Sequence, residues 1–188
     1  SAEWLQGLNK MDMIIVPSQH SKDVFEATKF EKKDENTGAK MGELKCEVPI
    51  HVLYEGVNTD IFKVTKEKDE EIEEIMSQVK GDCYLFVGHW LRGDLGQDRK
   101  DVSGLIKVFC ETFKNQKKKP ALVLKTSGAD FSHIDRREIR SKIQQVKSTI
   151  DSKDLPDIYF IHGDLSEKQM NHLYNHSKVK CHISFTKG

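Results

Sequence analysis

Short apolar runs alternate with longer amphipathic segments through most of the chain. The runs are rich in aliphatic and aromatic residues and lie next to turn residues, which is typical of buried strands. They are residues 84–87 (Tyr-Leu-Phe-Val), 121–124, 158–161 and 179–185. Between them, apolar residues recur at helical spacing in residues 102–113 and 139–150. This alternation predicts a Rossmann-like α/β fold, with one parallel sheet and helices on both of its faces.

Three further segments are assigned from the same pattern. A helix is predicted from Ser166, because Ser166 and Gln169 have the spacing of a capping box and an apolar stripe follows them. Residues 63–80 predict an exposed helix with only a few apolar residues facing inward. Residues 50–54 are predicted to open the main domain as a fifth strand of its parallel sheet.

The beginning of the chain has a different character. Residues 13–16 form one more strand-like run, and a short helix is predicted after Pro17. Residues 30–47 consist largely of Lys, Glu, Asp, Asn and Gly, which is the composition of a solvated linker. We therefore predict a domain boundary there, with residues 1–45 as a separate part plus linker and residues 46–188 as the main domain.

Composition excludes several classes of protein. The chain has 188 residues, of which 37% are hydrophobic, so it can bury the core of one domain. Thirty Lys and Arg balance thirty Asp and Glu, so no net charge would attract nucleic acid. No apolar run reaches the roughly 18 residues that span a bilayer, and the first residues lack a signal-peptide pattern. The sequence predicts a cytoplasmic protein with no transmembrane segment and no nucleic-acid partner.

Cysteine and histidine give no sign of a metal site. The four cysteines are far apart and lack a Cys-x-x-Cys pair, which predicts reduced thiols and no disulfide. His172 and His176 lie one helical turn apart, but Leu173 occupies the position of the zinc-protease glutamate. We expect both histidines to titrate near ordinary values if they are exposed to solvent. His162, at a strand end, is interpreted as a hydrogen-bonded structural residue.

The loop after the first main strand is the strongest candidate for chemistry. Ligands of parallel α/β sheets bind beyond the carboxyl ends of the strands, where helix N-termini face anions. Residues 88–100 contain three glycines and the cations Arg92, Arg99 and Lys100, which suits a phosphate group. Gly88 and Gly93 have the spacing of a P-loop, but Asp94 and Leu95 replace its Lys and Ser or Thr. The alternative is a charged surface loop without a ligand.

Five landmarks follow one another along the chain. They are Val16-Pro17-Ser18, residues 55–62 (Glu-Gly-Val-Asn-Thr-Asp-Ile-Phe), Phe86-Val87-Gly88 with downstream Arg99-Lys100, residues 160–166 (Phe-Ile-His-Gly-Asp-Leu-Ser) and residues 185–188 (Phe-Thr-Lys-Gly). In this order and spacing the chain resembles GT-B glycosyltransferases of the GT4 type, the group 1 glycosyltransferases. The resemblance extends over nearly the whole chain.

This resemblance implies retaining transfer of a sugar from a UDP- or GDP-sugar to an acceptor that the sequence does not name. Residues 46–188 would be the donor-binding domain, and residues 1–45 would be a remnant of the N-terminal GT-B domain. The donor-binding residues it implies are Gly88, His89, Arg99, Lys100, Lys125, Thr126, Gly163, Asp164, Leu165 and Gly188. His89 replaces the usual arginine of the family, so Arg92 or Arg99 would take its role. The family needs no metal or other cofactor here, and the catalytic residues are not identified.

The resemblance also implies that the chain is a fragment. The acceptor half of the N-terminal domain and the donor-site glutamates after Gly188 would lie outside it, so we expect weak nucleotide binding without turnover. Two alternatives stay open. One is a nucleotide-sugar 2-epimerase of the same architecture, although residues 55–62 and the Arg99-Lys100 pair favour the transferase. The other is a non-catalytic α/β interaction module, which nucleotide titration would distinguish.

Overall fold

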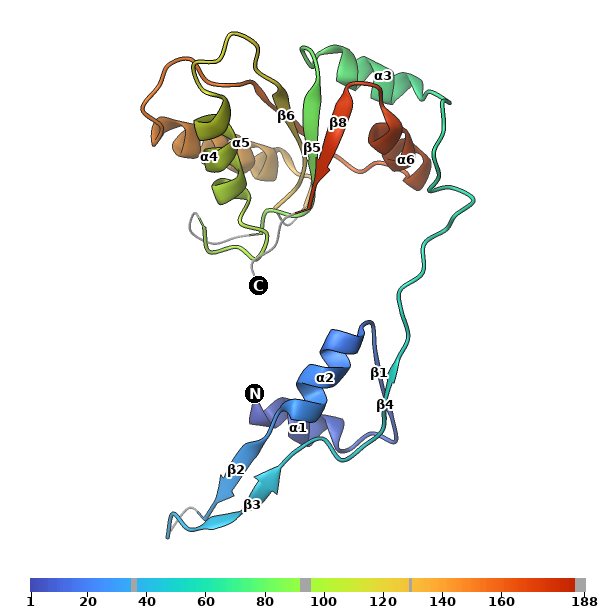
Figure 1. The fold of residues 1–188 in the computed structure, drawn as a ribbon, viewed down its shortest axis with the longest axis vertical. Coiled ribbons are helices and arrows are strands. Elements are labelled where there is room, and N and C mark those ends of the chain that lie inside the picture. The colour runs from blue at the N-terminus through green and yellow to red at the C-terminus, as the bar shows by residue number, and fades with distance from the viewer. Residues whose placement is uncertain (35–36, 92–95, 129, 185–188) are drawn as a thin grey trace. The chain divides into compact units, whose positions relative to one another are not determined.

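The chain folds into two compact units. The computed structural model describes residues 1–34, 37–91, 96–128 and 130–184 (Figure 1). Contacts within the chain divide it between residues 1–58 and residues 59–188. The predicted boundary at residue 45 therefore falls inside the first unit. The assignment of residues 1–45 and 46–188 to two GT-B domains stays a prediction.

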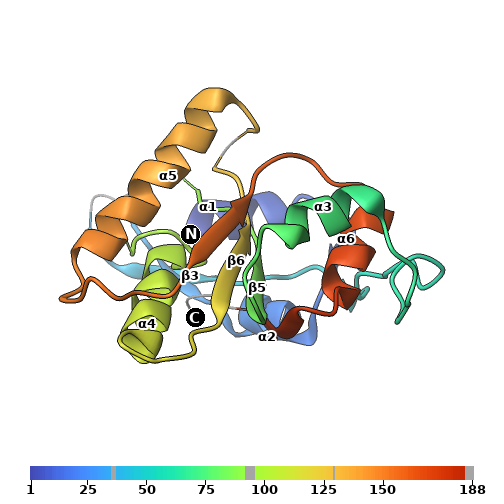
Figure 2. The ribbon, with the colours of Figure 1, turned by 90° about the horizontal axis from the view of Figure 1, so that it is seen from above.

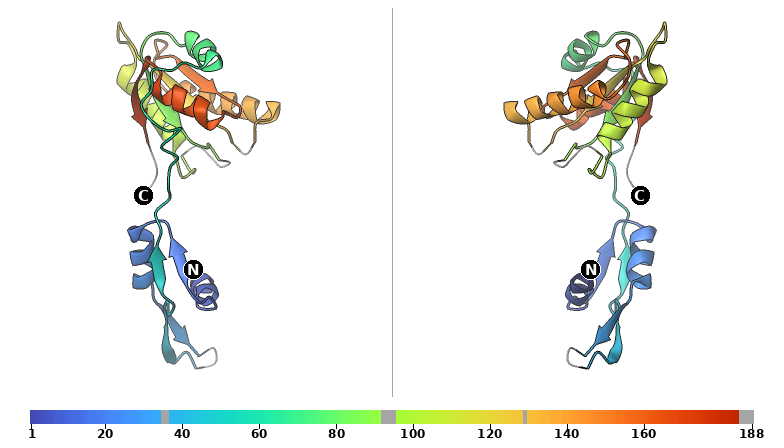
Figure 3. Two further views of the ribbon diagram at one scale, coloured as in Figure 1. Left: turned by 90° about the vertical axis from the view of Figure 1, so that its right-hand side faces the viewer. Right: turned by 90° about the vertical axis from the view of Figure 1, so that its left-hand side faces the viewer.

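The first unit is a small mixed α/β assembly. Its elements are α1 (Ala2–Leu8), β1 (Ile14–Val16), α2 (Gln19–Ala27), β2 (Phe30–Lys33), β3 (Lys40–Leu44) and β4 (Ile50–Val52). Strands β1 and β4 pair in parallel, and Ile14, Val16 and Ile50 form the buried centre. Strands β2 and β3 form a hairpin at one end of this unit, beyond the β1–β4 pair (Figure 3).

Two sequence-based predictions are wrong in this unit. Residues 30–47 are not only a linker, because an antiparallel main-chain ladder joins Phe30 to Leu44 and Lys40 pairs with Glu31 at 2.9 Å. Such a ladder tolerates polar side chains, since backbone groups make its hydrogen bonds. Residues 50–54 do not supply a fifth strand of the main sheet. Strand β4 pairs with β1 instead, where Ile50 lies opposite Ile14.

The second unit contains the predicted parallel sheet. Its strands are β5 (Cys83–Val87), β6 (Ala121–Lys125), β7 (Ile158–Ile161) and β8 (Val179–Ile183), in the order β7-β6-β5-β8. All three neighbouring pairs are parallel. Its helices are α3 (Glu70–Ser77), α4 (Val102–Phe113), α5 (His133–Ser148) and α6 (Glu167–Asn175). Helices α4 and α5 cover one face of the sheet, and α3 and α6 cover the other (Figures 1 and 2). This confirms the predicted fold class.

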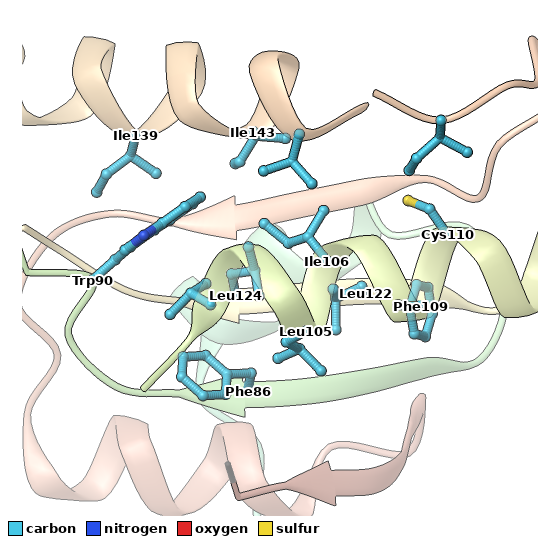
Figure 4. Close-up of a cluster of buried hydrophobic side chains, with 13 residues drawn as sticks. Phe86, Trp90, Leu105, Ile106, Phe109, Cys110, Leu122, Leu124, Ile139 and Ile143 are labelled. Atoms are coloured by element: carbon cyan, nitrogen blue, oxygen red, sulfur yellow. The ribbon is translucent and has the colours of Figure 1, made fainter. Parts of the chain in front are cut away.

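Each face of the sheet has its own apolar core. On one face, Phe86, Leu122 and Leu124 pack with Ile106 of α4 and Ile139 of α5 (Figure 4). On the other face, successive strand residues point the opposite way, and Leu85 and Val123 pack against α3 and α6. Burial on both faces explains why the strands read as continuous apolar runs instead of alternating ones.

Side-chain caps fix where the helices of the second unit begin. Ser166 and Gln169 form the predicted capping box at the start of α6, and Ser132 caps α5. Asp101 caps α4 with its backbone in the left-handed region, at φ 43°. These caps set the N-termini of α4, α5 and α6 just beyond the carboxyl ends of β5, β6 and β7. Helix N-termini at this edge of a parallel sheet are the usual place for an anion, and whether one binds here stays a prediction.

Two asparagines of α6 hold the segment that leads into α3. Asn171 Oδ1 accepts a hydrogen bond from the Lys63 amide at 3.2 Å, and Asn175 Oδ1 accepts one from the Thr65 amide at 3.2 Å. Asn175 Nδ2 also donates to the Lys63 carbonyl at 3.0 Å. The side-chain amides of α6 thus hold the backbone of residues 63–65 against the helix.

All four cysteines are free thiols. Burial raises the pKa of Cys83 to about 11, so that this thiol stays protonated in the core.

In the ranges that the structure describes, no helix has the length and apolar character needed to cross a membrane.

Candidate functional site

A cavity of about 220 Å³ lies at the carboxyl ends of β5 and β6, and we call it the strand-end cavity. Its lining residues are Val87, Gly88, His89, Lys125, Thr126, Ser127, Phe131, Asp164, Leu165 and Met170. Six residues of the predicted donor site are among them: Gly88, His89, Lys125, Thr126, Asp164 and Leu165. The loops after β5, β6 and β7 thus meet at one place, as the rule for parallel sheets predicts.

Hydrogen bonds join the loops after β5 and β6 side by side. The amide of Gly88 donates to the Lys125 carbonyl at 3.1 Å, and the amide of Trp90 donates to the Ser127 carbonyl at 2.7 Å. Nδ1 of His89 lies 3.0 Å from the Ser127 hydroxyl oxygen. The ring of Trp90 is buried in the core, which anchors the loop immediately after these contacts. One wall of the cavity is therefore fixed by backbone and side-chain bonds together.

Lys125 places a cation in the cavity. Its Nζ donates a hydrogen bond to the Gly163 carbonyl at 2.7 Å and lies 5.2 Å from the centroid of the Phe131 ring. Burial lowers the pKa of this lysine, and the nearby Asp164 carboxylate partly opposes that shift. Gly163 has a φ of 137°, a backbone conformation that glycine adopts readily and other residues do not. The predicted residue Gly163 therefore shapes the site through its carbonyl without lining the cavity.

Thr126 carries a hydroxyl that no described residue satisfies. The residue is 2% exposed, and its Oγ1 has no hydrogen-bond partner among the residues that the structure describes. A buried hydroxyl without a partner costs about 1–3 kcal/mol. Since Thr126 lines the cavity beside Lys125, a polar ligand atom bound there could remove this cost.

Arg99 and Lys100, the described basic residues of the β5–α4 loop, do not line the strand-end cavity. Lys100 is half-buried and its amide donates to Asp98 Oδ1 at 3.1 Å, whereas Arg99 is exposed. Their phosphate-binding role therefore stays a prediction. Arg92 and Gly188, which were also candidates, lie outside the described residues.

A buried pair behind the cavity was missed by sequence reasoning. Nε2 of His162 lies 2.8 Å from Asp135 Oδ2, and the two side chains are only 5% and 8% exposed. The amide of Gly128 donates to both carboxylate oxygens, at 3.0 and 3.1 Å. His162 is hydrogen-bonded, as the sequence interpretation expected, and its role stays a prediction. Asp135 gave no signal in the sequence, because an acidic residue in the first turn of a helix is common.

His176 is not exposed to solvent, so the expectation of an ordinary histidine pKa does not apply to it. Its side chain is 7% exposed and Nε2 lies 3.6 Å from Glu73 Oε1. Nδ1 accepts a hydrogen bond from the Lys178 amide at 3.2 Å. Burial lowers the pKa of His176, with Glu73 partly opposing the shift, so it does not titrate as an exposed histidine. Within the described ranges, no three His, Cys, Asp or Glu side chains are grouped so that they could hold a metal ion.

Comparison with known proteins identifies the fold. No protein family and no curated protein matches the chain by sequence. Among solved structures, it is similar to GT-B trehalose-6-phosphate synthases. The structure of OtsA aligns with a TM-score of 0.55 at 10% identity, over 98% of this chain and 41% of that chain. The chain has the Rossmann-like α/β fold of GT-B glycosyltransferases.

Two more of these structures give the same result. An apo structure of OtsA aligns with a TM-score of 0.54 at 10% identity, over 92% of this chain and 39% of that one. The enzyme from E. coli bound with UDP-2-fluoro glucose aligns with a TM-score of 0.51 at 12% identity, over 98% and 42%. The chain spans about two fifths of the length of these structures. The GT-B part of the sequence-based resemblance is therefore supported, and its GT4 part stays a prediction.

Proposed function

We propose that the chain is the donor-binding part of a retaining glycosyltransferase, and that a nucleotide-sugar binds at the strand-end cavity. The observation that carries this proposal is the convergence of Gly88, Lys125 and Thr126 at the carboxyl ends of two neighbouring strands. A structural neighbour of the same fold is bound with UDP-2-fluoro glucose, which is a nucleotide-sugar. The finer assignments to the GT4 type, and to UDP or GDP, rest on the sequence landmarks.

The chemistry of the cavity suits a diphosphate. Gly88 lines the cavity, but its amide already donates to the Lys125 carbonyl and the Phe86 ring fills the place of a Cβ, so the groups offered to an anion are side chains. Lys125 supplies a positive charge, and the hydroxyl of Thr126 supplies a hydrogen bond that no described residue uses. A fixed cation beside the leaving diphosphate would stabilise the charge that develops as the glycosidic bond breaks.

The size of the cavity limits what it holds. Pockets for complete small-molecule ligands commonly measure about 300–1,000 Å³. At about 220 Å³, the strand-end cavity has room for part of a nucleotide-sugar. The rest of the ligand would extend over the rim, where we propose that Arg99 and Lys100 contact phosphate. Gly163, Asp164 and Leu165 would border the nucleoside, with Arg92 and Gly188 as further candidates.

Calorimetric titration of the 188-residue chain with UDP, GDP and inorganic phosphate tests this proposal. We expect at least one nucleoside diphosphate to bind more tightly than phosphate. A non-catalytic interaction module would not discriminate between them. Changing Lys100 to Ala should weaken nucleotide binding about tenfold or more, the loss expected for one charge-assisted contact of roughly 1.5–3 kcal/mol.

The matched control is Lys118→Ala, which removes an exposed lysine before β6 and away from the cavity. It should leave nucleotide binding unchanged. Equal nucleotide affinities for the two lysine variants would mean that the Arg99-Lys100 loop does not contact the nucleotide. In the complete protein, product analysis distinguishes transfer to an acceptor from epimerisation of the nucleotide-sugar. Only transfer yields two products, a free nucleoside diphosphate and an acceptor that carries the sugar.

A further inference from the structure

Phe131 is a large aromatic residue of the cavity that the sequence landmarks do not include. It lies in the loop after β6, immediately before Ser132, the N-cap of α5. Its side chain lines the strand-end cavity, yet the residue is 45% exposed. A single exposed apolar residue is common on protein surfaces, so exposure alone does not indicate a function. What distinguishes Phe131 is that its ring contacts two neighbouring side chains, Lys125 and the buried His162.

Two contacts restrict the ring of Phe131. On one side, Lys125 Nζ lies 5.2 Å from the ring centroid. On another, the ring of His162 packs edge-to-face, with centroids 5.7 Å apart and planes at 77°. His162 is fixed in turn by its hydrogen bond to Asp135 and by an edge-to-face contact with Phe160 at 6.0 Å. An exposed ring is thus supported by a buried, hydrogen-bonded histidine.

The cavity has two kinds of lining. Its polar lining consists of Gly88, His89, Lys125, Thr126, Ser127 and Asp164, whereas Val87, Leu165, Met170 and Phe131 supply apolar surface. A nucleoside diphosphate likewise combines a charged diphosphate with a planar, weakly polar base. Aromatic side chains bind bases by stacking, and every base has a face that can stack.

We propose that Phe131 is the stacking platform for the nucleobase of the bound nucleotide, and that His162 is a positioning residue that orients this platform. The proposal rests on the proposed function, because it places the base at the same cavity. A preorganised ring loses less conformational freedom on binding, so the histidine behind it adds to affinity without contacting the ligand.

The test compares UDP and GDP with inorganic pyrophosphate, which has the diphosphate but no base. Calorimetry on the 188-residue chain should show that Phe131→Ala weakens nucleotide binding about tenfold and leaves pyrophosphate binding unchanged. Phe131→Trp should retain nucleotide affinity, because a larger ring can still stack. The matched control is Ile134→Ala, since Ile134 is 63% exposed three residues further along and does not line the cavity.

The role of His162 needs its own readout, because a buried residue can act merely by stabilising the fold. His162→Gln should weaken binding of the nucleotide and not of pyrophosphate. In the Phe131→Ala background, the same change should have no further effect on nucleotide affinity. Equal loss of nucleotide and pyrophosphate in the His162 variant would overturn the positioning role.

The remaining outcomes separate this proposal from the proposed function. If the unaltered chain binds neither nucleotide nor pyrophosphate, the proposed function fails and this inference fails with it. If the unaltered chain binds nucleotide and Phe131→Ala binds it equally well, the donor site stands and the platform is overturned. If Phe131→Ala loses both ligands equally, the residue shapes the whole cavity and the specific role in base binding is overturned.

Discussion

Lys125 Nζ lies 2.7 Å from the carbonyl oxygen of Gly163, which joins the end of β6 to the loop after β7. The contact uses one of the three hydrogens of the ammonium group. The Asp164 carboxylate and the Phe131 ring lie near the same nitrogen. The lysine therefore has a fixed position at the cavity and still has donors that a ligand can use.

Removing this cation should reduce anion binding. Lys125→Met retains much of the apolar stem and removes the charge, so UDP or GDP affinity should fall about tenfold or more. Calorimetry measures the change, and Lys118→Met serves as the control. Retention of full affinity in Lys125→Met would show that the diphosphate binds elsewhere.

The lowered pKa of Lys125 predicts how binding depends on pH. Burial shifts this pKa below the ordinary lysine value of 10.5, so the ammonium loses its proton at a lower pH than an exposed lysine does. A diphosphate binds the charged form, and its affinity should therefore fall as pH rises through the alkaline range.

The comparison variant is Lys125→Arg, whose guanidinium stays charged throughout this range. Titrations with UDP between about pH 7 and about pH 10 cover the relevant interval. The wild-type affinity should decline while that of Lys125→Arg stays level. Identical pH profiles for the two proteins would contradict the assignment.

Gly128 should not tolerate a side chain. A Cβ atom there would collide with Oδ1 of the buried Asp135 carboxylate, which also accepts the Gly128 amide. Gly128→Ala should lower the free energy of unfolding by about 1–3 kcal/mol, the usual cost of overpacking. Urea denaturation measures it.

A double-mutant cycle separates this collision from other effects of the substitution. In an Asp135→Ala background the colliding oxygen is gone, so adding Gly128→Ala should cost clearly less than it does in the unaltered chain. An equal cost in both backgrounds would mean that the carboxylate is not the cause.

His176 should make the second unit sensitive to acid. Its lowered pKa means that the folded state favours the neutral ring, while the unfolded state titrates near 6.5. Below that pH the unfolded chain binds more protons, so stability should be lost as pH falls through and below the unfolded value. Protonation of Nδ1 would also remove the acceptor for the Lys178 amide.

His176→Asn keeps an acceptor near the position of Nδ1 and cannot gain a charge. Its unfolding free energy, measured by urea denaturation between about pH 7 and about pH 5, should decline less steeply than that of the wild type. His133→Asn alters an exposed histidine at the start of α5 and should follow the wild-type curve. A wild-type slope in His176→Asn would refute the prediction.

The main sheet could be predicted because burial on both faces makes its strands continuous apolar runs. The same logic brought Gly88, Lys125 and Asp164 to one cavity, since the carboxyl ends of neighbouring parallel strands must meet. Helix α6 could be assigned from its capping box, which is a local signal.

The features that were missed depend on contacts between distant residues. The β2–β3 hairpin is held by backbone bonds between residues with polar side chains, so its sequence resembles a linker. Strand β4 pairs with β1 and not with the main sheet, and the local sequence of a strand does not specify which sheet it joins. The Asp135–His162 pair joins a helix start to a strand end and likewise requires the tertiary structure.

The strand order β7-β6-β5-β8 has a consequence for the growing chain on the ribosome. Strand β5 is the first of these four to be synthesised, and it lies between two neighbours that are made later. One of them, β8, begins only at Val179. Until then an apolar strand has an unpaired edge, which is a ready template for joining another chain. Nascent molecules halted before β8 should therefore aggregate and need chaperones more than molecules that include β8 do.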